Sequence, residues 1–203
     1  MTSHATTGLL ACLAATVLAF AAVPAPAAHA AEIDFDDVSV SPNTATFVSS
    51  SHYAPQGVTI QTVLDIGDGL VVGNSFTPVV SRNDFLVANF ASSTSKPNLA
   101  LADRVTNGFI TFASDEVLFT FASRQSGFSL NSDNAPLENP DVIRLLGLRN
   151  LGGGEFEVIA AIDGLDNQTT PAASLLSINC PGGCDAAMFV QTTELEGFDN
   201  LTF

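Results

Sequence analysis

Short apolar or alternating runs, separated by Gly, Pro, Asn, Asp and Ser, fill the sequence from residue 31 to residue 203. Hardly any window keeps the helical spacing of apolar residues for three turns, and Phe and β-branched residues concentrate in the runs. This pattern is typical of antiparallel sandwiches and barrels, so the sequence predicts an all-β fold. The expected strands are 32–37, 57–63, 86–90, 108–113, 117–122, 127–131, 142–149, 155–162, 174–178, 187–192 and 198–203.

The clearest expected hairpin joins residues 142–149 to residues 155–162. The connection between them is Asn150-Leu151-Gly152-Gly153-Gly154, which supplies glycines where a tight hairpin loop needs positive φ. Three glycines in a row also occur in phosphate-binding loops. No Lys-Ser or Lys-Thr follows here and no helix is expected, so the pattern favours the hairpin.

The first 30 residues contain no Asp, Glu, Lys or Arg, and residues 9–23 form an apolar run that ends before Ala28-His29-Ala30. These features predict a signal peptide over residues 1–30, cleaved after Ala30, and a secreted mature chain forming a single domain over residues 31–203. A short membrane anchor is the alternative, although the run is short for a bilayer. The segment Leu9-Leu10-Ala11-Cys12 superficially matches a lipoprotein box.

All 21 acidic and all 6 basic residues lie after residue 30, so the mature chain carries the net charge of −15. Nucleic-acid binding needs clustered Lys and Arg for the phosphates, and this charge balance excludes it. The acids are scattered between apolar runs, which argues against disorder. We interpret the acidity as a source of solubility outside the cell.

Two cysteines remain in the mature chain, Cys180 and Cys184, on either side of Pro181-Gly182-Gly183. Outside the cell such a pair predicts a local disulfide that closes a tight loop. A redox-active or metal-binding pair is the alternative. Zinc would need two further soft ligands, and His52 is the only other candidate in residues 31–203.

The two ends of the mature chain have the same pattern of apolar and acidic residues in opposite order. Alternation places Ile33, Phe35 and Asp37 on one face of the first strand, and Asp199, Leu201 and Phe203 on one face of the last. If the two strands pair antiparallel with 33 opposite 203, both apolar pairs face one core and Asp37 meets Asp199 at its rim.

Opposed carboxylates destabilise neighbouring strands unless a cation neutralises them. Calcium accepts carboxylate, Asn and backbone oxygens, so Asp36, Asp37, Asp199 and Asn200 form a candidate partial shell. The alternative is that these residues are solvated strand ends, with Asn200 in a turn.

Four segments together resemble a bacterial secreted jelly-roll domain that is often found in proteins of the PEP-CTERM sorted class. They are Ile33-Asp34-Phe35-Asp36-Asp37, Tyr53 with Gly57-Val58-Thr59-Ile60, Lys96-Pro97-Asn98, and Gly197-Phe198-Asp199-Asn200-Leu201-Thr202-Phe203. The resemblance implies a galactose-binding-like antiparallel sandwich, a jelly roll with adjacent first and last strands and with calcium near their acidic residues. The sequence ends at Phe203 without the C-terminal anchor of that class.

Catalytic patterns are weak in this sequence. His52 lies in a polar Ser-rich segment without a nucleophile-elbow pattern, and we interpret it as part of a loop. Asp115-Glu116, Glu155 and Glu157 are the nominees for paired carboxylates, which keep a small secreted hydrolase acting on polysaccharide as the alternative function. The segment from Asp65 to Gly69 lacks the spaced ligands of a calcium loop and is expected to be a turn.

Carbohydrate binding is the function that the resemblance implies first. Sugar sites on sandwiches usually offer Trp or Tyr faces, whereas residues 31–203 contain no Trp and only Tyr53. Bound calcium or polar loops remain as ways to hold an extracellular glycan. The sequence thus predicts a non-catalytic secreted module that binds a glycan or cell-surface component, or that serves as an envelope or matrix component.

Overall fold

Antiparallel pairing builds the described fold throughout. The computed structural model describes residues 31–64, 69–89, 98–101, 104–106, 109–111, 116–134, 142–165, 174–191 and 196–203. The predicted signal peptide and Cys12 lie outside these residues. The elements are β1 (Glu32–Ile33), β2 (Thr44–Ser49), the 3-10 turn η1 (Ala54–Gln56), β3 (Val58–Val63), β4 (Ser75–Phe76), β5 (Val80–Arg82), β6 (Asp84–Asn89), β7 (Leu99–Leu101), β8 (Arg104–Thr106), β9 (Phe109–Thr111), β10 (Glu116–Asn134), β11 (Val142–Gly152), β12 (Glu155–Leu165), β13 (Ser174–Gln191) and β14 (Glu196–Thr202).

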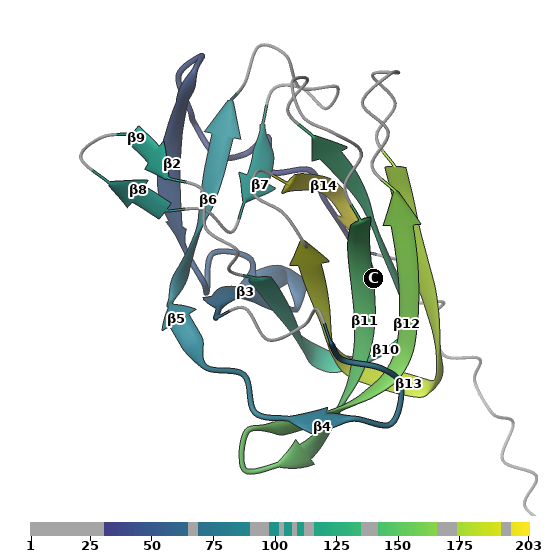
Figure 1. Ribbon diagram of the computed structural model, residues 1–203. Coiled ribbons are helices and arrows are strands. Elements are labelled where there is room, and N and C mark those ends of the chain that lie inside the picture. Colours follow the sequence, from purple (N-terminus) through teal and green to yellow (C-terminus); the bar gives the residue numbers. More distant parts are fainter. Residues whose placement is uncertain are drawn as a thin grey trace, which may run out of the picture.

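Two long strands, β10 and β13, bend and join two layers into one continuous sheet (Figure 1). Layer A contains residues 116–121 of β10 and 186–191 of β13, flanked by β3 and β5 on one side and by β11, β12 and β4 on the other. Layer B contains residues 127–134 of β10 and 174–179 of β13, followed by β14, then β1 and β7, then β6 and β2. The small β8–β9 hairpin pairs separately.

The main hydrophobic core lies between the two layers. The ring of Phe119 in layer A lies 5.2 Å from that of Phe198 in layer B, and Phe189 in layer A lies 5.6 Å from the same ring. All three side chains are at most 1% exposed. Their burial across the layers confirms the predicted all-β, antiparallel sandwich.

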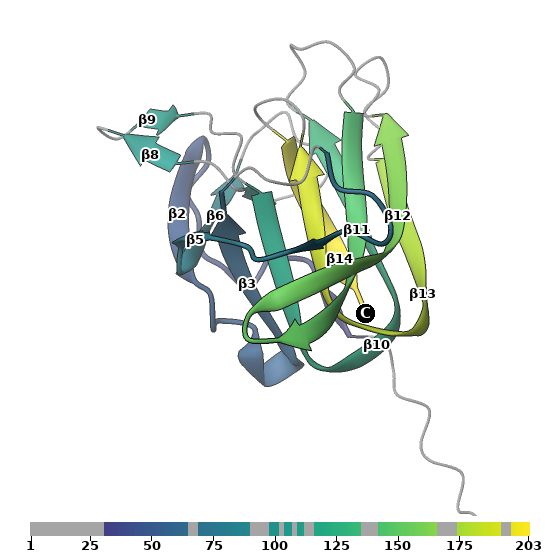
Figure 2. The same ribbon diagram turned by 60° about the horizontal axis from the view of Figure 1, so that its bottom comes forward.

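Residues 69–82, here called the strap, cross the outer face of layer A and carry β4 and β5 (Figure 2, blue). Leu70 and Phe76 of the strap pack on a second buried cluster on that face. The amide of Gly73 donates to the carbonyl of Val158 at 2.8 Å, and the amide of Val158 donates to the carbonyl of Asn74 at 2.9 Å. The strap therefore covers the outer face of layer A. Both faces of this layer are buried, the outer one under the strap and the inner one against layer B.

The expected hairpin at residues 142–162 is confirmed as β11 and β12. The first and last strands are adjacent and antiparallel, as predicted, but their register is two residues away from the expected one. Ile33 lies opposite Leu201 instead of Phe203, and the pairing stops there. The expected strands 117–122 and 127–131 are parts of the single strand β10, and 174–178 and 187–192 fall mainly within β13.

No helix in the part of the chain that the structure describes has the length and apolar character needed to cross a membrane.

Candidate metal centre at the joined termini

The edge of β14 that faces away from β10 is shared by two short strands. β1 pairs with Leu201 and Thr202, and β7 pairs with Gly197 and Phe198. Asp199 and Asn200 lie between these two pairings. Asn200 has a φ of +51°, and the register of β10 with β14 shifts by one residue there, which marks a β-bulge. A gap in the sheet edge thus opens at Asp199. We call the residues around this gap the terminal seam: the acidic turn of residues 34–37, Tyr53, Asn98 and Asp199.

The acidic turn after β1 lies at this gap. Phe35 adopts a φ of +58°, uncommon for a bulky residue, and its side chain is fully buried. Its ring packs edge-on against the rings of Tyr53 and Phe198, with centroids 5.5 Å away in both cases. Because Phe35 anchors the turn in the core, the neighbouring Asp34 and Asp36 remain exposed at the seam.

Asn98 closes the turn from the start of β7. Its side-chain Nδ2 donates to the carbonyls of Phe35 at 3.0 Å and Val38 at 2.7 Å, and its backbone amide donates to the carboxylate of Asp36. Both side-chain partners are acceptors, so the amide orientation is determined. Oδ1 of Asn98 is buried and has no hydrogen-bond partner among the described residues. Such an oxygen is costly to leave without a donor or a cation.

Asp37 links the acidic turn to the turn before β3. Its Oδ1 accepts a hydrogen bond from the Tyr53 hydroxyl at 2.6 Å, and its Oδ2 lies 3.1 Å from Nε2 of His52. Burial raises the pKa of Asp37, but the hydrogen bonds from Tyr53 and His52 outweigh burial and hold it below its ordinary value. Asp37 is therefore an ionised acceptor that holds the two turns together.

At the seam, the charges of neighbouring carboxylates act on both Tyr53 and Asp36. Burial raises the pKa of Tyr53 far above its ordinary range, and the charges of Asp37, Asp34 and Asp199 add to the rise. The pKa of Asp36 is also raised, first by burial and then by the charge of Asp34, against the lowering effect of the Asn98 amide. Ionisation of Asp36 thus opposes the folded state.

The four arginines whose side chains are described are bound to carboxylates elsewhere. They form ion pairs with aspartates or a glutamate outside the acidic turn: Arg82 with Asp84, Arg124 with Asp185, Arg144 with Asp163, and Arg149 with Glu157. These pairs lie on β5, β6, β10, β11, β12 and β13. Their positive charges therefore neutralise carboxylates outside the acidic turn.

The structure brings together only part of the predicted shell. Asp36 and Asp37 lie together in the acidic turn, and the charges of Asp37 and Asp199 both act on Tyr53. Asp37 and Asp199 are not opposed in a strand pair, however, because β1 ends at Ile33. Asn200 forms the bulge, and nothing places its side chain in the group. The residue pattern alone did not indicate Asp34 and Asn98 as members of this group. Both residues belong to segments that carry the resemblance, Ile33-Asp34-Phe35-Asp36-Asp37 and Lys96-Pro97-Asn98, but neither was assigned as a ligand.

The residues at the seam carry oxygen ligands of the type that a hard cation prefers. Carboxylate and Asn amide oxygens are ligands that calcium prefers. Within the described ranges, however, no three His, Cys, Asp or Glu side chains are grouped closely enough to hold a metal by themselves. A calcium ion here would therefore need the Asn98 amide oxygen or backbone carbonyls besides the carboxylates.

The nominated catalytic acids have unrelated surroundings. Glu116 is fully buried at the start of β10, and Glu155 is exposed at the start of β12. Glu157 forms an ion pair with Arg149, with a distance of 3.4 Å. Asp115 and the segment Asp65–Asp68 lie outside the described residues. His52 lies in a turn, as expected, and contacts Asp37.

A surface hollow of about 160 Å³ lies beside the seam, lined by Ala54, Gly57, Val58, Thr59, Thr120, Phe121 and Ala122. Its walls carry no charged side chain and only two hydroxyl groups. Small-ligand sites usually combine apolar walls with several convergent polar groups. The hollow does not have that combination.

No protein family model matches the sequence, and neither does any curated protein. Among solved structures, the K2 cleaved adhesin domain of Lys-gingipain is similar over 86% of this chain and 99% of that chain, with 10% identity and a TM-score of 0.41. The CBM22-1 and GH10 modules of Clostridium thermocellum endo-1,4-beta-D-xylanase 10B, complexed with xylohexaose, are similar over 86% of this chain and 28% of that chain, with 10% identity and a TM-score of 0.35. The assignment of an antiparallel sandwich rests on the strand pairing of this chain itself.

Proposed function

We propose that the protein is a secreted, non-catalytic β-sandwich module that binds calcium at its terminal seam. It acts in extracellular binding, with a glycan as the first candidate ligand, or as a component of the cell envelope or matrix. One observation carries the proposal: the acidic turn with Asp34, Asp36 and Asp37 is closed by Asn98, whose buried Oδ1 has no partner among the described residues. The charges of Asp34, Asp37 and Asp199 also act together on Tyr53, where the two ends of the domain meet.

Within this proposal, Asp36, Asp199 and Oδ1 of Asn98 hold the ion, with Asp34 on the exposed side. Asp37 serves as a support, because both of its oxygens already bind Tyr53 and His52. Calcium supplies the positive charge that removes the repulsion among the carboxylates. The ion would tie the turn after β1 to β14 and would thereby stabilise the joined ends of the domain.

Thermal unfolding of residues 31–203 tests the calcium site. A ligand that binds only the folded state raises Tm, and a hundredfold excess over Kd corresponds to roughly 5–10 °C for a domain of this size. We expect that rise in millimolar calcium relative to a chelator. We expect Asp36→Asn to raise Tm in the chelator, because it removes a charge that opposes folding, and to abolish the response to calcium.

Glu155→Gln is the matched control, because Glu155 is an exposed acid on the distant β11–β12 hairpin. This variant should keep the full calcium response. A Tm that calcium leaves unchanged in the unmutated protein would refute the site. A response that survives in both Asp36→Asn and Asp199→Asn would refute its location.

A glycan ligand would have to be held mainly without aromatic stacking. The large exposed hydrophobic side chains of the described residues include one aromatic, Phe47 on β2, and it is 41% exposed. The guanidinium carbon of Arg82 lies 3.8 Å from the centre of the Phe47 ring, so the guanidinium covers one face of that ring. Polar groups and bound calcium are the remaining means of recognition.

Glycan-array binding with and without calcium tests the binding role separately from the metal site. Calcium-dependent binding that Asp36→Asn abolishes would support recognition through the ion. Binding that calcium does not affect would assign recognition to another surface. A calcium-stabilised protein that binds no glycan would support the envelope or matrix role instead.

A further inference from the structure

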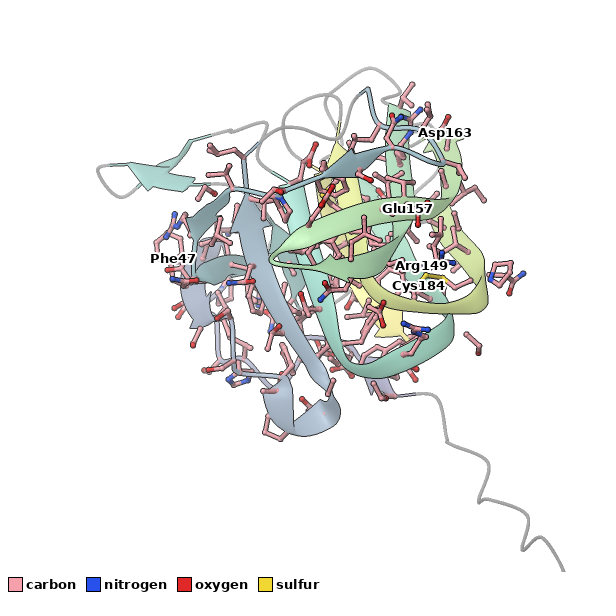
Figure 3. All side chains as sticks on the ribbon, turned by 90° about the horizontal axis from the view of Figure 1, so that it is seen from below. Phe47, Arg149, Glu157, Asp163 and Cys184 are labelled. Carbon is pink, nitrogen blue, oxygen red and sulfur yellow. A yellow bond between two sulfur atoms is a disulfide. The ribbon has the colours of Figure 1, made fainter. Side chains whose placement is uncertain are left out.

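The two layers of the sandwich share one corner, where β10 and β13 both bend. Ala186 to Phe189 of β13 pair with β10 in layer A, and Ser174 to Asn179 pair with it in layer B. Between these two pairings the register shifts on either side of Gln125, which lies opposite Cys184. The Cys180–Cys184 disulfide lies within this bend of β13, with its Cα atoms 5.5 Å apart. Figure 3 labels Cys184 in this region, near Arg149 of β11.

The sulfur atoms fill a space that a missing side chain leaves open. Gly147 of β11 lies against the disulfide: a Cβ atom there would lie 2.7 Å from Sγ of Cys184 and 3.1 Å from Sγ of Cys180. The same atom would lie 3.0 Å from Cδ1 of Ile178. Cys184 is fully buried and Cys180 is 3% exposed. The disulfide therefore fills the corner, and the space beside it is too small for a Cβ atom on residue 147.

A hydrogen-bond network holds the outer side of the same corner. Arg124 of β10 lays its aliphatic stem over Gly183 of the disulfide loop. Its guanidinium binds both carboxylate oxygens of Asp185, at 2.9 and 3.2 Å. Asp185 also accepts the backbone amide of Asn150 at 2.9 Å, which connects the corner to the β11–β12 hairpin. These contacts all depend on the position of β13 immediately after the disulfide.

We propose that the disulfide is a redox-dependent lock on this corner, so that the two layers close fully only after the chain reaches an oxidising environment. Two thiols cannot approach as closely as bonded sulfur atoms, which lie about 2.05 Å apart. Reduced cysteines would have to separate within a space already filled by Gly147 and Ile178, and overpacking of this kind displaces the backbone. The reduced corner stays open, whereas the oxidised corner shields its own bond from exchange.

The redox step is a two-electron exchange with a dithiol–disulfide couple: a disulfide oxidises the two cysteines and is itself reduced to two thiols, and a dithiol reverses the reaction. The thiolate of the dithiol attacks one sulfur of the Cys180–Cys184 bond, and the other sulfur leaves as a thiolate and takes up a proton. The second thiol of the dithiol then displaces the first cysteine, so the reductant ends as a cyclic disulfide and the protein as two thiols. In the folded protein, burial of both sulfur atoms keeps the attacking thiolate out.

Refolding with and without a dithiol tests the lock on the unmutated chain. After unfolding, we expect the oxidised chain to regain slow amide exchange along residues 174–191. We expect the chain kept reduced to exchange at least roughly tenfold faster at the corner and to melt several degrees lower. Equal Tm values and equal exchange in the two redox states would overturn the proposal.

Reduction of the folded protein tests the shielding. The bond should react with the dithiol at least roughly tenfold more slowly in native buffer than in denaturant, because attack must wait for the corner to open. A native bond that is reduced as fast as the denatured one would refute this part of the proposal.

Gly147→Ala in two backgrounds tests the packing that the lock depends on. With the disulfide intact, the new methyl group meets both sulfur atoms and should lower Tm. In the Cys180→Ala/Cys184→Ala background the sulfur atoms are gone, so the same substitution should cost much less. Equal costs in the two backgrounds would overturn the packing argument. A Cys180→Ala/Cys184→Ala variant that does not fold would also contradict the packing argument, because that argument attributes the open corner to the sulfur atoms of the reduced cysteines, which this variant lacks.

Discussion

At the scale of single residues, Tyr53 is central to the terminal seam. The ring is 1% exposed and contacts the buried rings of Phe35 and Phe85, whereas its hydroxyl reaches the half-exposed Asp37. One side chain therefore connects the core between the layers with the acidic turn. A buried Tyr hydroxyl that donates to a carboxylate also keeps its proton, because ionisation would place two negative charges side by side.

Tyr53→Phe should lower the free energy of unfolding by about 1.5 kcal/mol. The ring packing stays, but Asp37 loses a hydrogen bond from a partner in the core, and hydrogen bonds to charged groups contribute roughly this amount. The pKa of Asp37 should rise towards its ordinary value, which carboxyl NMR titration would show. His52→Ala is the comparison on the exposed side of Asp37 and should cost less. A loss from His52→Ala equal to that from Tyr53→Phe would contradict the role given to the buried hydroxyl.

At the scale of elements, the strap determines that the outer face of layer A is buried. Its inward side chains Leu70 and Phe76 cover apolar residues that would otherwise be exposed, and β4 pairs with the edge of β12. The outward side chains Val71 and Val72 are 57% and 59% exposed. The outer face of layer A is thus a second core rather than a ligand platform.

Phe76→Ala should destabilise the fold by about 2 kcal/mol. Phe76 is only partly buried, so the cost lies below the roughly 3–5 kcal/mol of a fully buried Phe. Val72→Ala, on the outward side of the same strap, should change stability by less than about 0.5 kcal/mol. Urea unfolding of both variants measures the difference. Equal effects would mean that the strap does not stabilise layer A.

At the scale of the whole molecule, the described arginines neutralise some of the acidic residues and leave others. The aspartates bound to arginine include Asp163 on β12 and Asp185 on β13. Hydrogen bonds from Arg144 and Arg124, respectively, lower the pKa of each, against the raising effect of burial. Asp36 at the seam shows the opposite shift. Acid therefore weakens one part of the molecule while it relieves repulsion in another.

The stability of the protein should fall below about pH 4 in part through these two ion pairs. A carboxyl whose pKa is lowered by folding stabilises the fold above its unfolded pKa of about 3.9, and this contribution disappears as the pH falls through the folded value. Asp163→Asn/Asp185→Asn should therefore lose less free energy of unfolding between pH 7 and pH 3 than the unmutated protein. Denaturant titrations at both pH values make the comparison, and equal losses would exclude these pairs as the cause.

The sequence predicted the strand type well because alternation and loop residues are local signals. The hairpin of β11 and β12 is an example, with its glycines at positive φ. The four strands that the prediction placed in the middle and towards the end are in fact parts of β10 and β13. Polar residues such as Ser123 and Gln125 look like loop residues, but they lie in the bend of a continuous strand that pairs on both sides of it.

The sequence by itself determined the class of the fold and the cysteine pair, because both follow from patterns that each segment carries alone, whereas the adjacency of the two ends was expected from the resemblance to jelly-roll domains. Only the tertiary structure decided the register of β1, the bulge at Asn200 and the gathering of Asp34 and Asn98 at the seam. These features depend on the burial of the Phe35 ring between Tyr53 and Phe198. Contacts between residues so far apart in the chain form only when the layers close, and no local pattern encodes them.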